Sequence, residues 1–130
     1  MTGNNSGAIG DPSVISGNGS YALGNDNTLS GNASHILGND NVVGGDNTVV
    51  MGNNVTTTAK DAVILGNESA SNRDNTVSVG AVGKERQIIN VKAGEADTDA
   101  VNVKQMKDAD TATLNNAKTY TNEREVVIRQ

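Results

Sequence analysis

The sequence predicts a mainly β protein: a solenoid with turns of 14 residues, followed by a helix. Glycine recurs every seventh residue, apolar residues fall in columns at a period of 14, and no glycine or proline follows Asp99. Hydrophobic residues make up 35% of the 130 residues, and there is no tryptophan or phenylalanine. Typical globular domains have roughly 45–50% apolar residues, so a conventional aromatic-centred core is excluded.

Composition excludes several functional classes. The formal net charge is −5, and the ten basic residues are spread along the chain, which argues against nucleic-acid binding. Without cysteine there is no disulfide framework, no thiolate zinc site and no cysteine nucleophile. No run of about 18 apolar residues could span a membrane, and Met1–Ser6 lacks the basic and apolar character of a signal peptide. We therefore expect no cofactor.

The glycine row marks the corners of the solenoid. Glycine costs about 1 kcal/mol at each helical position, so a regular row of glycines excludes a coiled coil there. We interpret each 14-residue unit as two short strands joined by two tight corners, where glycine supplies backbone angles that other residues resist. Asn, Asp and Ser fill the rest of each corner. The glycines of the full period, predicted as structural corners, are Gly10, Gly24, Gly38, Gly52, Gly66 and Gly80.

Two apolar columns of the first strand share a parity and are predicted to form the core. One column directly precedes the corner glycines, and the other lies two residues earlier. The first comprises Ile9, Leu23, Leu37, Met51, Leu65 and Val79, and the second Gly7, Tyr21, His35, Val49, Val63 and Val77. The second strand carries the column Ile15, Leu29, Val43, Thr57 and Ser71, which is apolar early and polar late.

The opposite parity of the first strand is also apolar, in five of its six positions: Ala8, Ala22, Ile36, Val50, Ile64 and Ser78. A strand that is apolar on both faces is normally buried on both. We therefore expect another copy of the chain to cover this column. The predicted interface residues in the solenoid are Ala22, Ile36, Val50 and Ile64.

The last third of the chain changes character. After the charged residues 84–87, Ile88–Val91 is a candidate last strand, and residues 94–99 form a polar connector. We predict a helix from Asp99 onward, with Asp97, Thr98 and Asp99 as its capping residues. Its apolar face is too weak for a solitary helix, so Val103 and Met106 are predicted to lie in the seam of an oligomeric coil. Both heptad and eleven-residue spacings fit, which leaves the handedness of the coil open.

Two types of segment resemble parts of a known protein family. Asn47–Gly52 and Asp74–Gly80 form one type, and Arg86–Gly94 followed by Thr98–Lys107 forms the other. The first type is similar to the head repeat, and the second to the neck, of the YadA-like trimeric autotransporter adhesins. The resemblance implies a homotrimer of left-handed parallel β-rolls, then a neck and a three-stranded α-helical coiled coil. It assigns residues 1–83 to the head, 84–107 to the neck and 108–130 to the start of the stalk.

The resemblance also implies a function without catalysis. Heads of this family bind host matrix proteins or host cells, so we expect a bacterial surface adhesin that gains affinity from multivalent contacts. The alternative is a structural spacer whose binding site lies in another domain. An outer-membrane anchor is expected outside this chain. Tyr21 and His35 depart from the usual small aliphatic residues, and the corner at residues 56–60 lacks its glycine, so collagen binding does not transfer directly.

His35, the one histidine, offers two interpretations. A threefold ring of imidazoles could bind a metal, but the predicted inward position favours stacking on Tyr21. The Asp/Asn clusters match neither of the common calcium-loop spacings, so corner chemistry is favoured over calcium binding. The period of 14 also argues against the hexapeptide acyltransferases.

Overall fold

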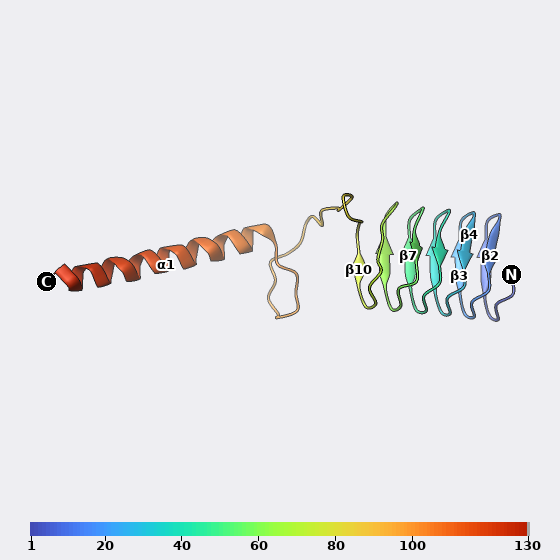
Figure 1. The fold of residues 1–130 in the computed structure, drawn as a ribbon, viewed down its shortest axis with the longest axis horizontal. Coiled ribbons are helices and arrows are strands. Elements are labelled where there is room, and N and C mark those ends of the chain that lie inside the picture. Colours follow the sequence, from blue (N-terminus) through green and yellow to red (C-terminus); the bar gives the residue numbers. More distant parts are fainter. Residues whose placement is uncertain (130) are drawn as a thin grey trace. The chain divides into compact units, whose positions relative to one another are not determined.

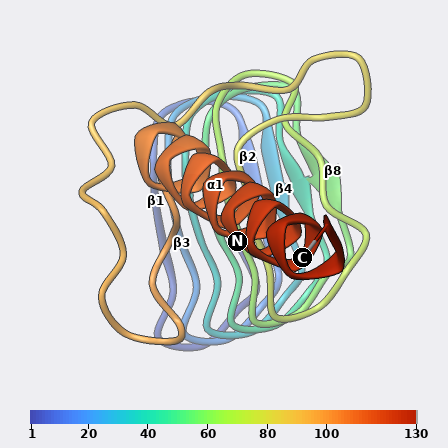
Figure 2. The same cartoon turned by 90° about the vertical axis from the view of Figure 1, so that its left-hand side faces the viewer.

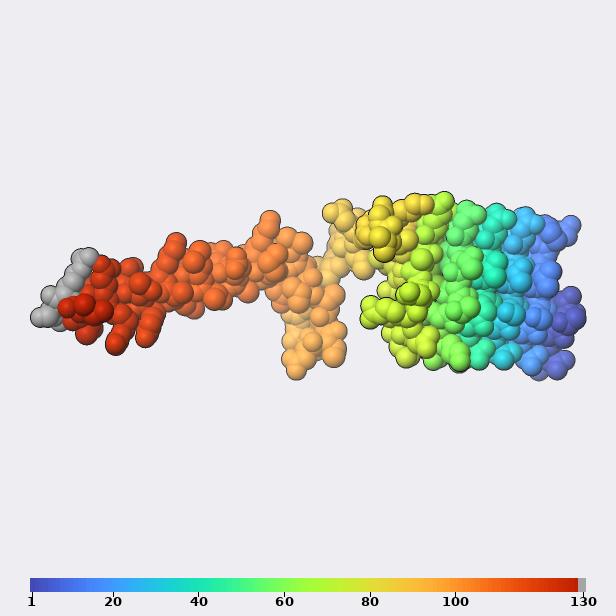
Figure 3. All heavy atoms as spheres, viewed as in Figure 1, coloured from blue at the N-terminus to red at the C-terminus, as the bar shows by residue number. Residues whose placement is uncertain are grey.

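The computed structural model describes residues 1–129 and divides the chain into two compact units. The first unit, Met1–Arg86, is called the head here, and the second begins at Gln87. The head is a parallel β-solenoid in which the first four turns each add two short strands and the last two turns add one each (Figures 1 and 2). The space-filling view shows the turns of the head as successive layers lying against one another (Figure 3).

The strands of the head form two parallel sheets. Sheet A comprises β1 (Gly7–Ile9), β3 (Tyr21–Leu23), β5 (His35–Leu37), β7 (Val49–Met51), β9 (Val63–Leu65) and β10 (Val77–Ser78). Sheet B comprises β2 (Ser13–Ile15), β4 (Asn27–Leu29), β6 (Val42–Val43) and β8 (Thr56–Thr57). Every strand pairs with residues 14 positions along the chain, as in Tyr21 with His35, so the predicted 14-residue turn is confirmed.

The predicted parity of sheet A is wrong. The middle residue of β3, β5, β7 and β9 faces the interior, and the column expected outside forms the core: Ala22, Ile36, Val50 and Ile64 are at most 4% exposed. This column packs with Ile15, Leu29 and Val43 of sheet B. The columns expected inside are outside, with Tyr21 50% and Met51 51% exposed. Alternation allows either the middle or the two end side chains of a short strand to face inward, and the narrow interior between two sheets suits aliphatic groups better than Tyr or His.

Close approach between turns explains the glycine row. A Cβ atom on Gly24 would lie 1.7 Å from the carbonyl oxygen of Gly38, and one on Gly31 would lie 1.9 Å from that of Gly45. Gly10, Gly24, Gly38 and Gly66 also have positive φ angles, whereas Gly31 and Gly45 do not. Left-handed backbone recurs two residues after most of the slots, at Asp26 (φ 58°) and Asp40 (φ 59°) for example. Glycine is therefore needed for spacing where a carbonyl of the next turn lies this close, and for its backbone angle only at some positions.

Polar side chains stack as buried ladders beside the apolar core. The hydroxyl of Ser34 donates to the carbonyl oxygen of Gly45 at 2.7 Å and accepts from the backbone N–H of Thr48 at 3.0 Å. At the opposite corner, the amide of Asn27 donates to Gly38 and accepts from Asn41. Every buried side-chain polar atom in the described residues has a partner. These ladders let a chain with few apolar residues close its core.

The second unit contains one helix, α1 (Val103–Arg129), preceded by a folded connector. The helix begins four residues later than predicted because Asn102 is its cap: the Asn102 Oδ1 atom accepts the Gln105 N–H at 2.9 Å. Asp99 caps a turn instead, accepting N–H groups from Glu95 and Ala96. The expected strand at Ile88–Val91 is absent from the described structure, and Ile88 and Ile89 are exposed.

Candidate interaction surfaces

The outer side of sheet A is an exposed, uncharged and mainly apolar face, called outer face A here. It alternates with the core column along every strand because side chains of a strand point to opposite sides. Leu37 is 44% exposed and Leu23 48%. A depression of about 400 Å³ lies at the N-terminal end of this face and is lined by β1, β3 and β5. Outer face A comprises Gly7, Ile9, Tyr21, Leu23, His35, Leu37, Val49, Met51, Val63, Leu65 and Val77.

Tyr21 and His35 are the aromatic pair on outer face A. Their ring centroids are 6.0 Å apart and their planes 12° apart, so the predicted stacking is confirmed. Their position is the reverse of the predicted one, because both rings are exposed. The phenol hydroxyl and the imidazole are the polar side-chain groups in an otherwise aliphatic surface.

The solenoid residues predicted for the trimer interface are corrected by their burial. Ala22, Ile36, Val50 and Ile64 are enclosed within their own chain and offer no surface to a second copy. The exposed apolar atoms belong to the neighbouring residues of the same strands. On α1, in contrast, Val103 and Met106 are 64% and 52% exposed, which leaves them free to contact another helix.

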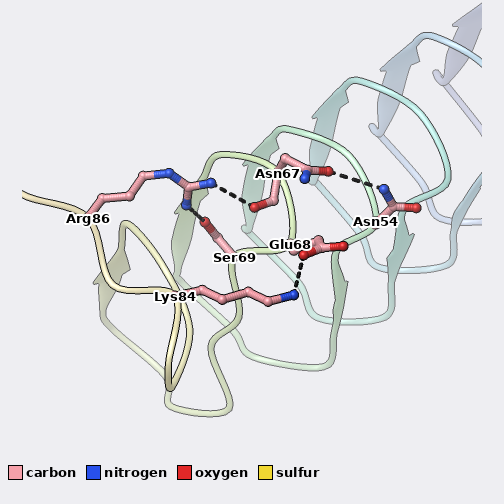
Figure 4. A network of polar contacts seen from close by, with 6 residues as sticks. All are labelled: Asn54, Asn67, Glu68, Ser69, Lys84 and Arg86. Carbon is pink, nitrogen blue, oxygen red and sulfur yellow. Dashed lines mark hydrogen bonds and ion pairs between the residues drawn. The ribbon is translucent and has the colours of Figure 1, made fainter.

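Charged side chains finish the head at its C-terminal end (Figure 4). The Arg86 guanidinium donates to the carbonyl oxygens of Asn67 and Val79 and to the Ser69 hydroxyl, at 2.7–3.0 Å. Lys84 pairs with Glu68, and its hydrogen bond and charge lower the pKa of that carboxyl group. Arg86 thereby supplies donors where a further turn would supply backbone N–H groups. The compact unit ends at Arg86, three residues beyond the expected end of the head at residue 83.

Arg86 was not among the residues predicted from the sequence to make contacts within the head. Its three hydrogen bonds reach residues 7 to 19 positions away, and only the stacked turns bring those positions together. One pattern could have indicated its role: the row of glycines ends just before the charged segment that contains Arg86.

The connector before α1 is held to the helix by amide side chains. Gln105 makes two hydrogen bonds with the backbone of Gly94, at 2.8 and 2.9 Å. The Asn102 amide donates to the carbonyl oxygen of Val91 at 2.9 Å. Asp99 accepts backbone N–H groups of Ala96 and Glu95, which lowers the pKa of its carboxyl group. The neck sequence therefore forms a compact turn on the first helical turn.

Metal and membrane features are absent from the described residues. Nowhere in residues 1–129 do three His, Asp or Glu side chains gather as a metal site. Within the same range, α1 is not apolar enough to cross a bilayer.

Parts of the chain are similar to known proteins. Residues 87–125 match the family described as "Coiled stalk of trimeric autotransporter adhesin". The chain is also 53% identical over 45 residues to the autotransporter adhesin EhaG of Escherichia coli O157:H7. That alignment covers 35% of this chain and 3% of the relative, so the chain spans a small part of that protein's length.

A solved structure is also similar: the collagen-binding domain of the Yersinia adhesin YadA. The match covers 82% of this chain and 72% of that one, with 31% identity and a TM-score of 0.39. The family match over residues 87–125 confirms the resemblance inferred from the neck sequence.

Proposed function

We propose that this chain is the head and the start of the stalk of a homotrimeric bacterial surface adhesin, which binds host matrix proteins or host-cell molecules without catalysis. The main observation in support is outer face A, an apolar surface along the head. In the sequence, the head is followed directly by residues that match the stalk of the trimeric family. Exposed apolar surface of this extent marks an interaction site. A trimer with its copies packed through outer face A would bury it.

The second unit supports the same assembly. No described side chain from Gln87 to Ile128 is buried, although Val103, Met106, Leu114, Val127 and Ile128 are apolar. A solitary helix with so few internal contacts is marginal in water. Three parallel copies would provide a seam for these residues and would hold three heads at the same level.

Adhesion is assigned to the surfaces that the trimer leaves open. Sheet B presents Val14, Thr28, Val42 and Thr56 outward, all exposed, beside corners rich in Asn and Asp. Three repeated copies of such a surface would multiply weak contacts, so avidity replaces a deep pocket. In the full-length protein we place this segment on the bacterial surface, held by an outer-membrane anchor.

The second candidate is a structural spacer. The observation in its favour is that the chain spans 3% of the length of EhaG, which leaves much of such a protein to carry a binding site elsewhere. Both candidates share the trimer and differ in whether the head itself binds.

The test combines assembly with binding. We expect light scattering to give the mass of three chains, and Leu37→Asp to open the packing between heads while the strand signal in circular dichroism persists. The intact trimer is then applied to an array of matrix proteins and glycans, with Leu37→Asp as the control. Binding above that control supports adhesion. A trimer that binds nothing supports the spacer, and a Leu37→Asp head indistinguishable from wild type contradicts packing through outer face A.

A further inference from the structure

We propose that His35 makes the packing between heads sensitive to acid, so that the heads separate when the imidazoles take up protons. This inference rests on the proposed trimer through outer face A. His35 is the one histidine of that face, and histidine is the residue type whose unperturbed side chain changes charge between pH 5 and 8. Each copy brings one imidazole, and threefold symmetry places all three at the same level.

The surroundings of His35 are apolar on its own sheet. Within that sheet its partners in register are Tyr21 on β3 and Val49 on β7, and Leu37 follows on the same strand. Within the described residues the imidazole stacks on Tyr21 and makes no hydrogen bond or ion pair. A neutral imidazole both donates and accepts a hydrogen bond, whereas the charged form only donates. Burying the charged form without an acceptor or a counter-charge is strongly unfavourable.

No anion on outer face A offsets that cost. Tyr21 is the other titratable side chain on the face, and the remaining members of the face are glycine or aliphatic residues. The corners that flank β3, β5 and β7 carry Asp26, Asp40 and Asp46. Within residues 1–129 none of these carboxylates pairs with His35, and the Oδ1 atom of Asp46 accepts the Asn32 N–H at 2.9 Å. A sister copy brings the same uncharged face.

The direction of the effect follows from proton linkage. Separated heads leave the imidazole in water, where histidine ordinarily takes up a proton near pH 6.5. Packed heads disfavour the proton, so packing is fully stable above about pH 6.5 and weakens as the pH falls. With one proton excluded per chain, the equilibrium for separating three heads shifts by up to about a thousandfold per pH unit.

The absence of cysteine permits a direct test on the full chain. Val63→Cys places a unique thiol on outer face A two strands away from His35, and Thr28→Cys places one on the outward side of sheet B as the reference. The probe is a disulfide reagent that reacts at acidic pH. Neither thiol adjoins the imidazole, whose charge would otherwise activate a neighbouring thiol directly, so the ratio of the two labelling rates measures how far the heads have opened.

We expect the Val63→Cys site to label at least tenfold more slowly than the reference at pH 8, and the ratio to rise at least tenfold by pH 5.5. Adding His35→Val should keep the slow labelling and abolish its pH dependence. An unchanged ratio, or a rise that persists with His35→Val, overturns the switch while leaving the trimer interface intact. Equal labelling of both sites at pH 8 in the His35 chain overturns the proposed interface and the switch together.

Discussion

The head and the second unit solve the same shortage of apolar residues in opposite ways. The head closes its core inside one chain, where Ile15, Leu29 and Val43 are completely buried against the core column of sheet A. In the second unit no described side chain from Gln87 to Ile128 is buried. Repeated turns of one chain can therefore bury a core that would otherwise require several copies of the chain. A solenoid turn packs on its successor, whereas a single helix has only its sister helices.

The largest expected effect separates core from surface within one strand type. Ile64→Asp places an unpaired charge in the core and should destabilise the head by about 3–5 kcal/mol, with loss of the strand signal in circular dichroism. Leu65→Asp changes the next residue, on outer face A, and should leave the fold of each head intact. If Ile64→Asp gives folded monomers instead, the core assignment of this column is wrong.

The second prediction concerns spacing between turns. Gly31→Ala would set a Cβ atom 1.9 Å from the carbonyl oxygen of Gly45, so turns must move apart. Overpacking of this kind costs about 3 kcal/mol or more, measured as a lower midpoint in urea. Gly44→Ala is the matched control, because its nearest contact would be 3.6 Å. Equal stability of the two variants would contradict the close approach of the turns.

The third prediction addresses the second unit. Met106→Asp should weaken the association of the helices by about 1–3 kcal/mol and reduce helical circular dichroism on dilution, because it puts three carboxylates in one seam. The strands of the head should melt as in wild type. Thr111→Asp, outside the predicted seam, serves as the control. A loss of helix that is equal in both variants would argue against Val103 and Met106 as seam residues.

The smallest effect tests the backbone of the corners. Ala33 has a φ angle of 52°, a conformation that costs an ordinary residue about 1 kcal/mol. Ala33→Gly should therefore raise the free energy of unfolding by about 0.5–1 kcal/mol. Ala8→Gly, on exposed strand β1, should lower it by a similar amount. Thermal melting of both variants checks the pair, and destabilisation by Ala33→Gly would contradict the strained corner.

Sequence patterns predicted the architecture well and the direction of individual side chains poorly. Glycine spacing determined the 14-residue turn because a carbonyl of the next turn leaves no room for a Cβ atom. Sheet A was ambiguous since both of its sides are apolar, so parity alone could not separate the Ile36 column from the His35 column. Residue size could have identified the core column, because tyrosine and histidine are too large and too polar for the position in a turn that Ala22 occupies.

Four features follow from the sequence: the 14-residue repeat, the arrangement of short strands in two sheets, the Tyr21–His35 stack and the family resemblance of the neck. Each depends on residues at a fixed separation, which a periodic backbone converts directly into contacts. The choice of the core column and the contacts of Arg86 required the folded head, because they depend on the curvature of the corners and on groups that several turns bring together. The Asn102 cap is a local contact with Gln105, and the structure was needed to choose it over the nearby Asp97 and Asp99.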